Sequence, residues 1–268
     1  MAAIDVWAQQ PNPHFLSQPY FDSLKRWTGE DLTDISPEFL IGCMDKADVG
    51  HALLSAWYGP QGPLISNEQV LEMIQAYPSR FSGLASADLR DPVAAVNTLR
   101  KYVTEHGFKG LRLIQWLWEL PSTHALYYPL LAACVELDVP VCLQVGHTGP
   151  LLSSESGRPA HIERMALDFP DLKIIGGHIG YPWHVEMIAV ATKFPNVYID
   201  TSAYVPKRYP RELVEYMQGH GKHKVMFGTN YPMITPDRAM AQLDLLELSD
   251  DVRDLFLEGN ARRVFDID

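Results

Sequence analysis

The chain has 268 residues, of which 47% are hydrophobic, 10% aromatic and 21% charged. This composition is typical of a folded globular protein and excludes a largely disordered or fibrous one. The 33 acidic residues outnumber the 22 lysines and arginines, and the net charge of −11 repels phosphate backbones and anionic lipid surfaces. We therefore expect a small-molecule substrate, with neither a nucleic acid nor a membrane as partner.

The cysteines and the N-terminal residues predict where the protein resides. Cys43, Cys134 and Cys142 are odd in number and widely spaced, which suits neither a disulfide framework nor a CxxC metal site. The first residues lack the basic and apolar regions of a signal peptide, and no apolar run approaches the ~18 residues of a membrane span. A cytoplasmic location is the resulting prediction.

Short apolar runs recur along the chain and predict β-strands. The strongest of them are almost entirely apolar, as is typical of strands that are buried on both faces of a parallel sheet. In chain order the strands are expected at residues 3–8, 51–56, 81–87, 110–115, 141–146, 173–177, 197–202 and 224–228.

Amphipathic segments between these runs predict helices. One begins at Asp91-Pro92 and ends at His106-Gly107, and the segments 159–169 and 183–194 each stop at a proline. No break in composition divides the chain, so we expect one domain over residues 1–268. Strands and helices that alternate over about 250 residues predict a (β/α)₈ TIM barrel. An open doubly wound sheet is the alternative, but no GxGxxG follows the first strand.

Three polar residues follow expected strands, at the end of a barrel where chemistry takes place. His147, His178 and Asn230 come after the fifth, sixth and eighth strands. Each histidine has nearby glycines, which let the backbone bend and a ligand approach. Metal ligation, proton transfer and hydrogen bonding to a substrate carbonyl are all open roles for the two imidazoles.

Charged residues within the strands form a second group of candidates. Asp5 and Asp200 are either general bases or structural hydrogen-bond acceptors. Arg112 lies in an apolar strand and needs an anion, which is either a barrel aspartate or a substrate carboxylate. Aromatic residues gather near the strand ends and predict an apolar pocket; they are Trp7, Trp57, Tyr58, Trp116, Trp118, Tyr181, Trp183 and Tyr231.

Together these motifs resemble the amidohydrolase-related family. This branch of the amidohydrolase superfamily includes aminocarboxymuconate-semialdehyde decarboxylase, γ-resorcylate decarboxylase and 2-pyrone-4,6-dicarboxylate lactonase. The resemblance covers nearly the whole chain. It rests on the segments GLRL, FPDLKIIGGHIGYPW, PNVYIDTS, FGTNYPMITPDRA and GNARRVF.

The chain departs from the family pattern at the expected metal site. The family has His-x-His on the first strand, where residues 7–9 read Trp-Ala-Gln, and an aspartate after the eighth strand, where Asn230 stands. His147 matches the metal ligand of the fifth strand, and His178 matches the histidine of the sixth, which acts as an acid/base or contacts the substrate. A single remaining ligand does not hold Zn²⁺ firmly. We therefore predict no cofactor, with one Zn²⁺ bound weakly through His147 and His178 as the alternative.

These considerations predict a metal-independent hydrolase that acts on a small cyclic or aromatic carbonyl compound, such as a lactone or an amide. His178 would activate water as a general base, while His147 and the Asn230 amide would polarise the carbonyl. The residues expected to bind the substrate are Arg112, Gln9, Trp7, Trp57 and Trp183.

Two other functions stay open. The first is a non-oxidative decarboxylase of an aromatic carboxylic acid, which the resemblance to the two decarboxylases implies. The second is a barrel that binds a small molecule without converting it. A homodimer is expected from the family resemblance alone.

Overall fold

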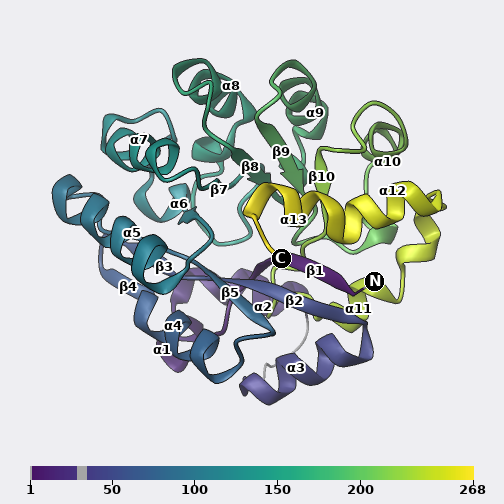
Figure 1. The fold of residues 1–268 in the computed structure, drawn as a ribbon, viewed down its shortest axis with the longest axis horizontal. Coiled ribbons are helices and arrows are strands. Elements are labelled where there is room, and N and C mark those ends of the chain that lie inside the picture. Colours follow the sequence, from purple (N-terminus) through teal and green to yellow (C-terminus); the bar gives the residue numbers. More distant parts are fainter. Residues whose placement is uncertain (1, 29–34) are drawn as a thin grey trace.

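The computed structural model describes residues 2–28 and 35–268, and its strands alternate with helices that surround them (Figure 1). The strands expected from the sequence are all present, each within a few residues of its predicted bounds. They are β1 (Ala3–Ala8), β2 (Val49–Ser55), β5 (Phe81–Leu84), β6 (Leu111–Leu113), β7 (Val141–Gln144), β8 (Ile174–Gly177), β9 (Val197–Asp200) and β10 (Val225–Met226).

Two parallel sheets join to close the barrel. One has the strand order β1-β2-β5 and the other β10-β9-β8-β7-β6. The bridges between Ala8 and Tyr231 and between Ala85 and Leu111 connect the sheets at their two seams. At the first seam the Val6 N–H also donates to the Phe227 carbonyl over 3.0 Å. The predicted (β/α)₈ barrel is therefore confirmed.

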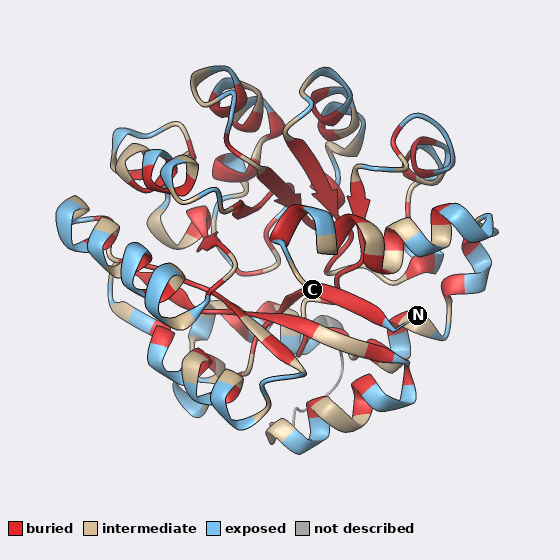
Figure 2. Ribbon diagram, viewed as in Figure 1, coloured by how far each residue is buried: buried red, intermediate tan, exposed pale blue. Residues whose placement is uncertain are grey.

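The helices cover the outside of the barrel, with their inner faces buried and their outer faces exposed (Figure 2). The cap of α5 agrees with the prediction: Asp91 accepts the Ala94 N–H over 3.0 Å, and Gly107 ends the helix with a φ of 69°. The helices are α1 (Pro13–Leu16), α2 (Asp22–Thr28), α3 (Pro37–Lys46), α4 (Asn67–Ala76), α5 (Pro92–His106), α6 (Gln115–Trp118), α7 (Tyr128–Glu136), α8 (Pro159–Asp168), α9 (His184–Lys193), α10 (Arg211–Gln218), α11 (Pro236–Met240), α12 (Asp250–Asp254) and α13 (Asn260–Phe265). In the described part of the chain, no helix combines the length and apolar character needed to cross a bilayer.

The interior of the barrel divides into an apolar part and a polar part. Ile4, Leu53 and Ile175 pack in one cluster with Val264 and Phe265 of α13. The polar part is formed by the buried side chains of Asp5, Ser55, Arg112 and Asp200. Asn260 of α13 donates to the Lys222 carbonyl over 2.8 Å, just before β10, so α13 and the apolar part lie at the amino ends of the strands. The polar part therefore lies toward the carboxyl ends.

A hairpin that the sequence analysis did not predict follows β2. It consists of β3 (Trp57–Gly59) and β4 (Gly62–Ile65), which pair antiparallel. The hairpin places Trp57 beside two other rings, 5.1 Å from Phe15 and 5.8 Å from Trp116 between centroids. It therefore contributes an aromatic wall above the barrel.

Candidate active site

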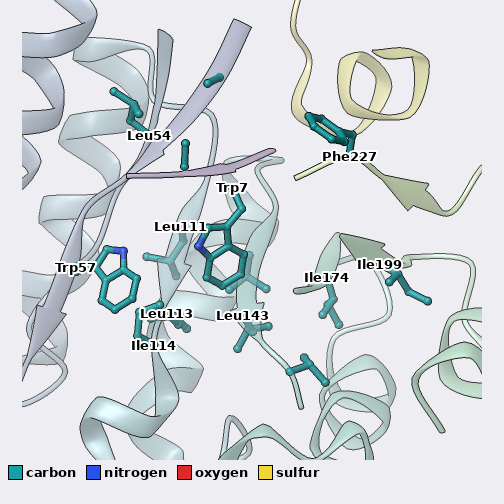
Figure 3. Close-up of a cluster of buried hydrophobic side chains, with 14 of the residues drawn as sticks. Trp7, Leu54, Trp57, Leu111, Leu113, Ile114, Leu143, Ile174, Ile199 and Phe227 are labelled. Carbon is teal, nitrogen blue, oxygen red and sulfur yellow. The ribbon is translucent and has the colours of Figure 1, made fainter. Parts of the chain in front are cut away.

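A cavity of about 970 Å³ lies at the carboxyl ends of the strands, where (β/α)₈ barrels place their chemistry. Figure 3 shows the Trp7 side chain from β1 in the middle of the barrel and Trp57 beside Ile114. Most of the residues selected from the sequence come together on the cavity wall. These are Trp7, Gln9, Trp57, His147, His178 and Asn230.

Arg112 and Trp183 lie away from this wall, which differs from the prediction that they contact the substrate. Arg112 is 0% exposed inside the barrel, where its Nε donates to Ser55 Oγ over 2.9 Å and its guanidinium lies 3.3 Å from the Trp7 ring centroid. Trp183 packs instead against the Arg158 guanidinium at 4.4 Å. The Trp7 indole therefore lies between Arg112 and the cavity. Trp183, in the turn before α9, packs on Arg158 and does not line the cavity.

His178 is buried where β8 ends and forms part of the cavity wall. Its ring centroid lies 4.4 Å from that of Trp7, and its Nδ1 lies 2.7 Å from Ser202 Oγ. Burial, followed by the positive charge of Arg112, lowers the pKa of His178 from 6.5 to about 3. The imidazole is therefore neutral at physiological pH.

Steric contacts and an unusual backbone conformation characterise the residues around His178. A Cβ atom on Gly177 would lie 2.3 Å from Cζ3 of Trp7, so glycine is required for the indole to pack there. His178 and Ile179 both have a φ of 63°, which is an outlier for a β-branched residue such as Ile179. Strain of this kind costs about 1–3 kcal/mol and is concentrated at functional sites.

His147 occupies a different position, on the exposed loop that follows β7. Its backbone N–H donates to the Tyr181 carbonyl over 2.5 Å, and its Nδ1 lies 3.4 Å from Ser154 Oγ. The two histidines predicted to act together therefore differ in setting, because His147 is solvated whereas His178 is buried.

Gln9 and Asn230 form an amide pair on the wall. The Nε2 group of Gln9 donates to Asn230 Oδ1 over 3.0 Å, and the backbone N–H of Gln9 donates to the Tyr231 carbonyl over 3.1 Å. This pairing engages the Asn230 carbonyl and leaves its NH₂ group near the Met233 sulfur, 3.6 Å away. Any oxyanion contact from Asn230 must therefore come from that NH₂ group.

Asp5 holds the loop after β10 against β1. Its Oδ1 accepts the N–H groups of Trp7 over 3.0 Å and of Thr229 over 2.9 Å, and its Oδ2 accepts the Thr229 hydroxyl. These contacts favour the interpretation of Asp5 as a structural acceptor. Burial raises its pKa from 3.8 to about 7.

The raised pKa of Asp5 makes the free energy of unfolding depend on pH. The folded state retains this proton up to about pH 7, whereas the unfolded chain loses it near pH 4, so this group contributes less stability as the pH rises through that range. Asp5→Asn keeps an acceptor for the two N–H groups and removes the titration. The difference in free energy of unfolding between the variant and wild type should therefore shift in favour of the variant by about 2–3 kcal/mol from pH 5 to pH 7.

Urea unfolding of both proteins at several pH values measures this difference. Asp244→Asn, at an exposed position, is the matched control and should follow the wild-type curve. Parallel pH profiles for Asp5→Asn and wild type would contradict the raised pKa.

Several cavity residues were missed by the sequence analysis. Lys25 of α2, Arg208 in the turn Pro206–Arg208 and Arg238 of α11 line the cavity, as does the buried Gln144. Among the described residues, the wall includes no Asp or Glu. The three cations lie in helices and turns away from the strand ends, and strand-end reasoning gives no signal for such positions.

The comparisons with known proteins identify the family. A family model described as amidohydrolase matches residues 4–267, so the chain belongs to this family of the amidohydrolase superfamily. This confirms the family resemblance and the prediction of an enzyme at that level. A γ-resorcylate decarboxylase from Polaromonas sp. is 25% identical over 246 residues, covering 75% of this chain and 74% of the relative.

Solved structures share the fold. An uncharacterized TIM-barrel protein from Bordetella bronchiseptica is 23% identical with a TM-score of 0.87, over 98% of both chains. A dihydroxybenzoic acid decarboxylase from Polaromonas sp., solved with bound manganese and 2-nitroresorcinol, is 19% identical with a TM-score of 0.75, over 99% of this chain and 97% of the other.

These relatives correct two predictions. The hydrolase prediction is wrong, because proteins that are similar to this chain in sequence and in structure are decarboxylases. This similarity favours the alternative, a non-oxidative decarboxylase of an aromatic carboxylic acid. The prediction of no cofactor is also contradicted, because related decarboxylases bind manganese. The cytoplasmic location and the homodimer stay predictions.

The side chains around this cavity differ from those of a divalent-metal site. Manganese sites use carboxylate and imidazole ligands, and here Trp7 and Gln9 occupy the end of β1 while Asn230 follows β10. Within residues 2–28 and 35–268, no group of three or more His, Cys, Asp or Glu side chains is placed to hold an ion. The described side chains do not fit the metal of the relatives, and we derive no reaction step through it.

Proposed function

We propose that the protein is a non-oxidative decarboxylase of small aromatic carboxylic acids. The observation that carries this proposal is the cavity wall, which combines aromatic rings with three cationic side chains and, among the described residues, no acidic one. On a chain with a net charge of −11, such a wall provides local attraction for an aromatic anion. The relatives include a γ-resorcylate decarboxylase and a 2,6-dihydroxybenzoate decarboxylase, and these names support the same substrate class.

The lining of the cavity suits an aromatic substrate. Its volume of about 970 Å³ is at the upper end of the range of small-molecule sites and has room for one aromatic ring with its substituents. Phe15, Phe21, Trp57 and Trp116 pack edge to face or tilted on one side, which offers a substrate ring both faces and edges to contact.

Decarboxylation needs one proton at the ring carbon that carries the carboxylate. Because His178 is neutral, it first has to accept a proton, and a phenolic hydroxyl beside the carboxylate supplies it to Nε2. The phenolate pushes electrons into the ring, and the imidazolium, a strong acid in this setting, protonates the ring carbon. The electron pair of the broken C–C bond returns to the ring as CO₂ leaves, and the product phenolate takes a proton from water.

Product analysis tests the reaction class. The purified protein is incubated with 2,6-dihydroxybenzoate, with its methyl ester and with benzoate, in one series with manganese chloride and in another without it. We expect bicarbonate from the dihydroxybenzoate, none from benzoate and no methanol from the ester. Methanol without bicarbonate would show a hydrolase, and binding without any product would overturn the proposed catalysis.

Arg208 provides a test of the charge of the cavity wall. Its side chain is exposed on the wall, and we expect Arg208→Gln to raise KM for an aromatic acid about three- to tenfold with little change in kcat, because the lost attraction acts mainly on binding. Lys207→Gln is the matched control, since this neighbouring exposed cation is not among the wall residues. Equal KM values for the two variants would contradict a role for Arg208 in binding.

A further inference from the structure

A buried chain of three polar side chains reaches the cavity from β9. Asp200 and Ser202 are 0% exposed, and His178 forms part of the cavity wall. Ser202 Oγ lies 2.7 Å from His178 Nδ1 and donates a very short hydrogen bond to Asp200 Oδ1. The Ser202 backbone N–H donates to the same carboxylate oxygen over 2.8 Å.

The direction of these hydrogen bonds sets the tautomer of the histidine. The Ser202 hydroxyl has one proton, and it is directed to Asp200 Oδ1. Burial raises the pKa of Asp200, whereas Arg112 and the hydrogen bonds from Ser202 lower it, and in the ionised form that these contacts favour the carboxylate only accepts. The contact between Ser202 Oγ and His178 Nδ1 therefore requires the proton on Nδ1, with Oγ as acceptor. The unprotonated nitrogen is then Nε2, which is left to meet a molecule in the cavity.

We propose that Ser202 is a positioning residue that holds His178 with its proton on Nδ1 and its Nε2 lone pair available to the substrate. This proposal rests on the proposed function, in which Nε2 accepts the phenolic proton. An Nε2–H tautomer cannot accept that proton. In serine proteases, where an aspartate holds the histidine directly, the wrong tautomer lowers kcat about 10⁴-fold.

The first readout is the tautomer itself and needs no substrate. In ¹⁵N-histidine-labelled wild type at neutral pH, two-bond ¹H–¹⁵N spectra should show a protonated Nδ1 and an unprotonated Nε2 for His178, assigned by its loss in His178→Gln. Ser202→Ala should convert the ring partly or wholly to the Nε2–H form. A wild-type Nε2–H tautomer, or an unchanged tautomer in Ser202→Ala, would overturn the proposal.

The second readout is kinetic. Ser202→Ala should lower kcat about 10²-fold or more while KM stays within about threefold, because positioning of the base acts on the chemical step. Ser202→Thr retains a hydroxyl and should restore the Nδ1–H tautomer and part of kcat. Ser122→Ala removes an equally buried hydroxyl that lines no part of the cavity and should leave tautomer and rate unchanged.

The two readouts separate the possible failures. An Nδ1–H tautomer that depends on Ser202, with no decarboxylation of any aromatic acid, would refute the proposed function and leave the positioning intact. Decarboxylation with a tautomer independent of Ser202 would refute the positioning alone. If Ser202→Ala fails to fold, the wild-type tautomer still decides whether the hydrogen bonds run in the direction inferred here.

Discussion

Replacing His178 by glutamine should lower kcat for an aromatic acid about 10²- to 10⁴-fold, the usual contribution of a positioned acid or base. Glutamine is similar in size and can still bond to Ser202, so the packing against Trp7 should persist. The expected loss follows from the absence of a ring nitrogen that accepts a proton and returns it to carbon. Initial rates of bicarbonate release, compared at equal folded fraction by circular dichroism, measure the effect.

His184→Gln is the matched control for this experiment. His184 lies at the start of α9, pairs with Glu212 at 3.6 Å and does not line the cavity. We expect its rate to remain within about twofold of wild type, as for most changes away from a site. If His178→Gln kept wild-type turnover, the proton transfer assigned to His178 would be wrong.

The largest effect on stability is expected for Arg112→Met. The change removes a fully buried guanidinium that stacks on Trp7 and bonds to Ser55, and it removes the positive charge that lowers the pKa of the buried Asp200. Loss of one partner from buried charges of opposite sign lowers the free energy of unfolding by about 3–5 kcal/mol. Methionine fills part of the space, so the loss should come mainly from electrostatics.

Urea unfolding at neutral pH measures this loss, with Arg164→Met as the control. Arg164 is largely exposed and pairs with Asp168 on α8, so its replacement should lower the free energy of unfolding only slightly. Similar, small losses for the two variants would contradict the view that Arg112 neutralises the polar part of the barrel.

The barrel was predictable because its strands and helices differ in local pattern. Apolar runs marked the strands, and Asp91 and Gly107 marked the ends of α5 by cap chemistry that depends on neighbouring residues alone. The hairpin after β2 was missed because β3 and β4 are three and four residues long, too short for a period to be recognised.

The candidate site was only partly predictable. The strand-end rule selected His178 and Asn230, which line the cavity, but it gave no sign that the Trp7 indole covers Arg112. That arrangement depends on an irregularity in the pairing of β1 between Asp5 and Ala8 and on the space left by Gly177. Such features arise from tertiary contacts that a linear pattern does not encode.

The reaction class was the part that residue types could not decide. A histidine and an amide at strand ends serve water activation and proton transfer to carbon equally well, so these residue types do not distinguish a hydrolase from a decarboxylase. The similarity to decarboxylases corrected that prediction. The cationic side chains of the wall, Lys25, Arg208 and Arg238, meet only in the folded protein and agree with an anionic substrate.

In the proposed reaction, the protein cleaves a carboxyl group from an aromatic ring and delivers a proton in its place. The most direct measurement is the incubation of 2,6-dihydroxybenzoate with the protein in D₂O, followed by NMR of the product and by assay of bicarbonate. We expect 1,3-dihydroxybenzene with a single deuterium at the former carboxyl position and an equal amount of bicarbonate, beyond any exchange in a control with product alone. Recovery of unchanged 2,6-dihydroxybenzoate from folded protein that binds it would contradict the proposed decarboxylation.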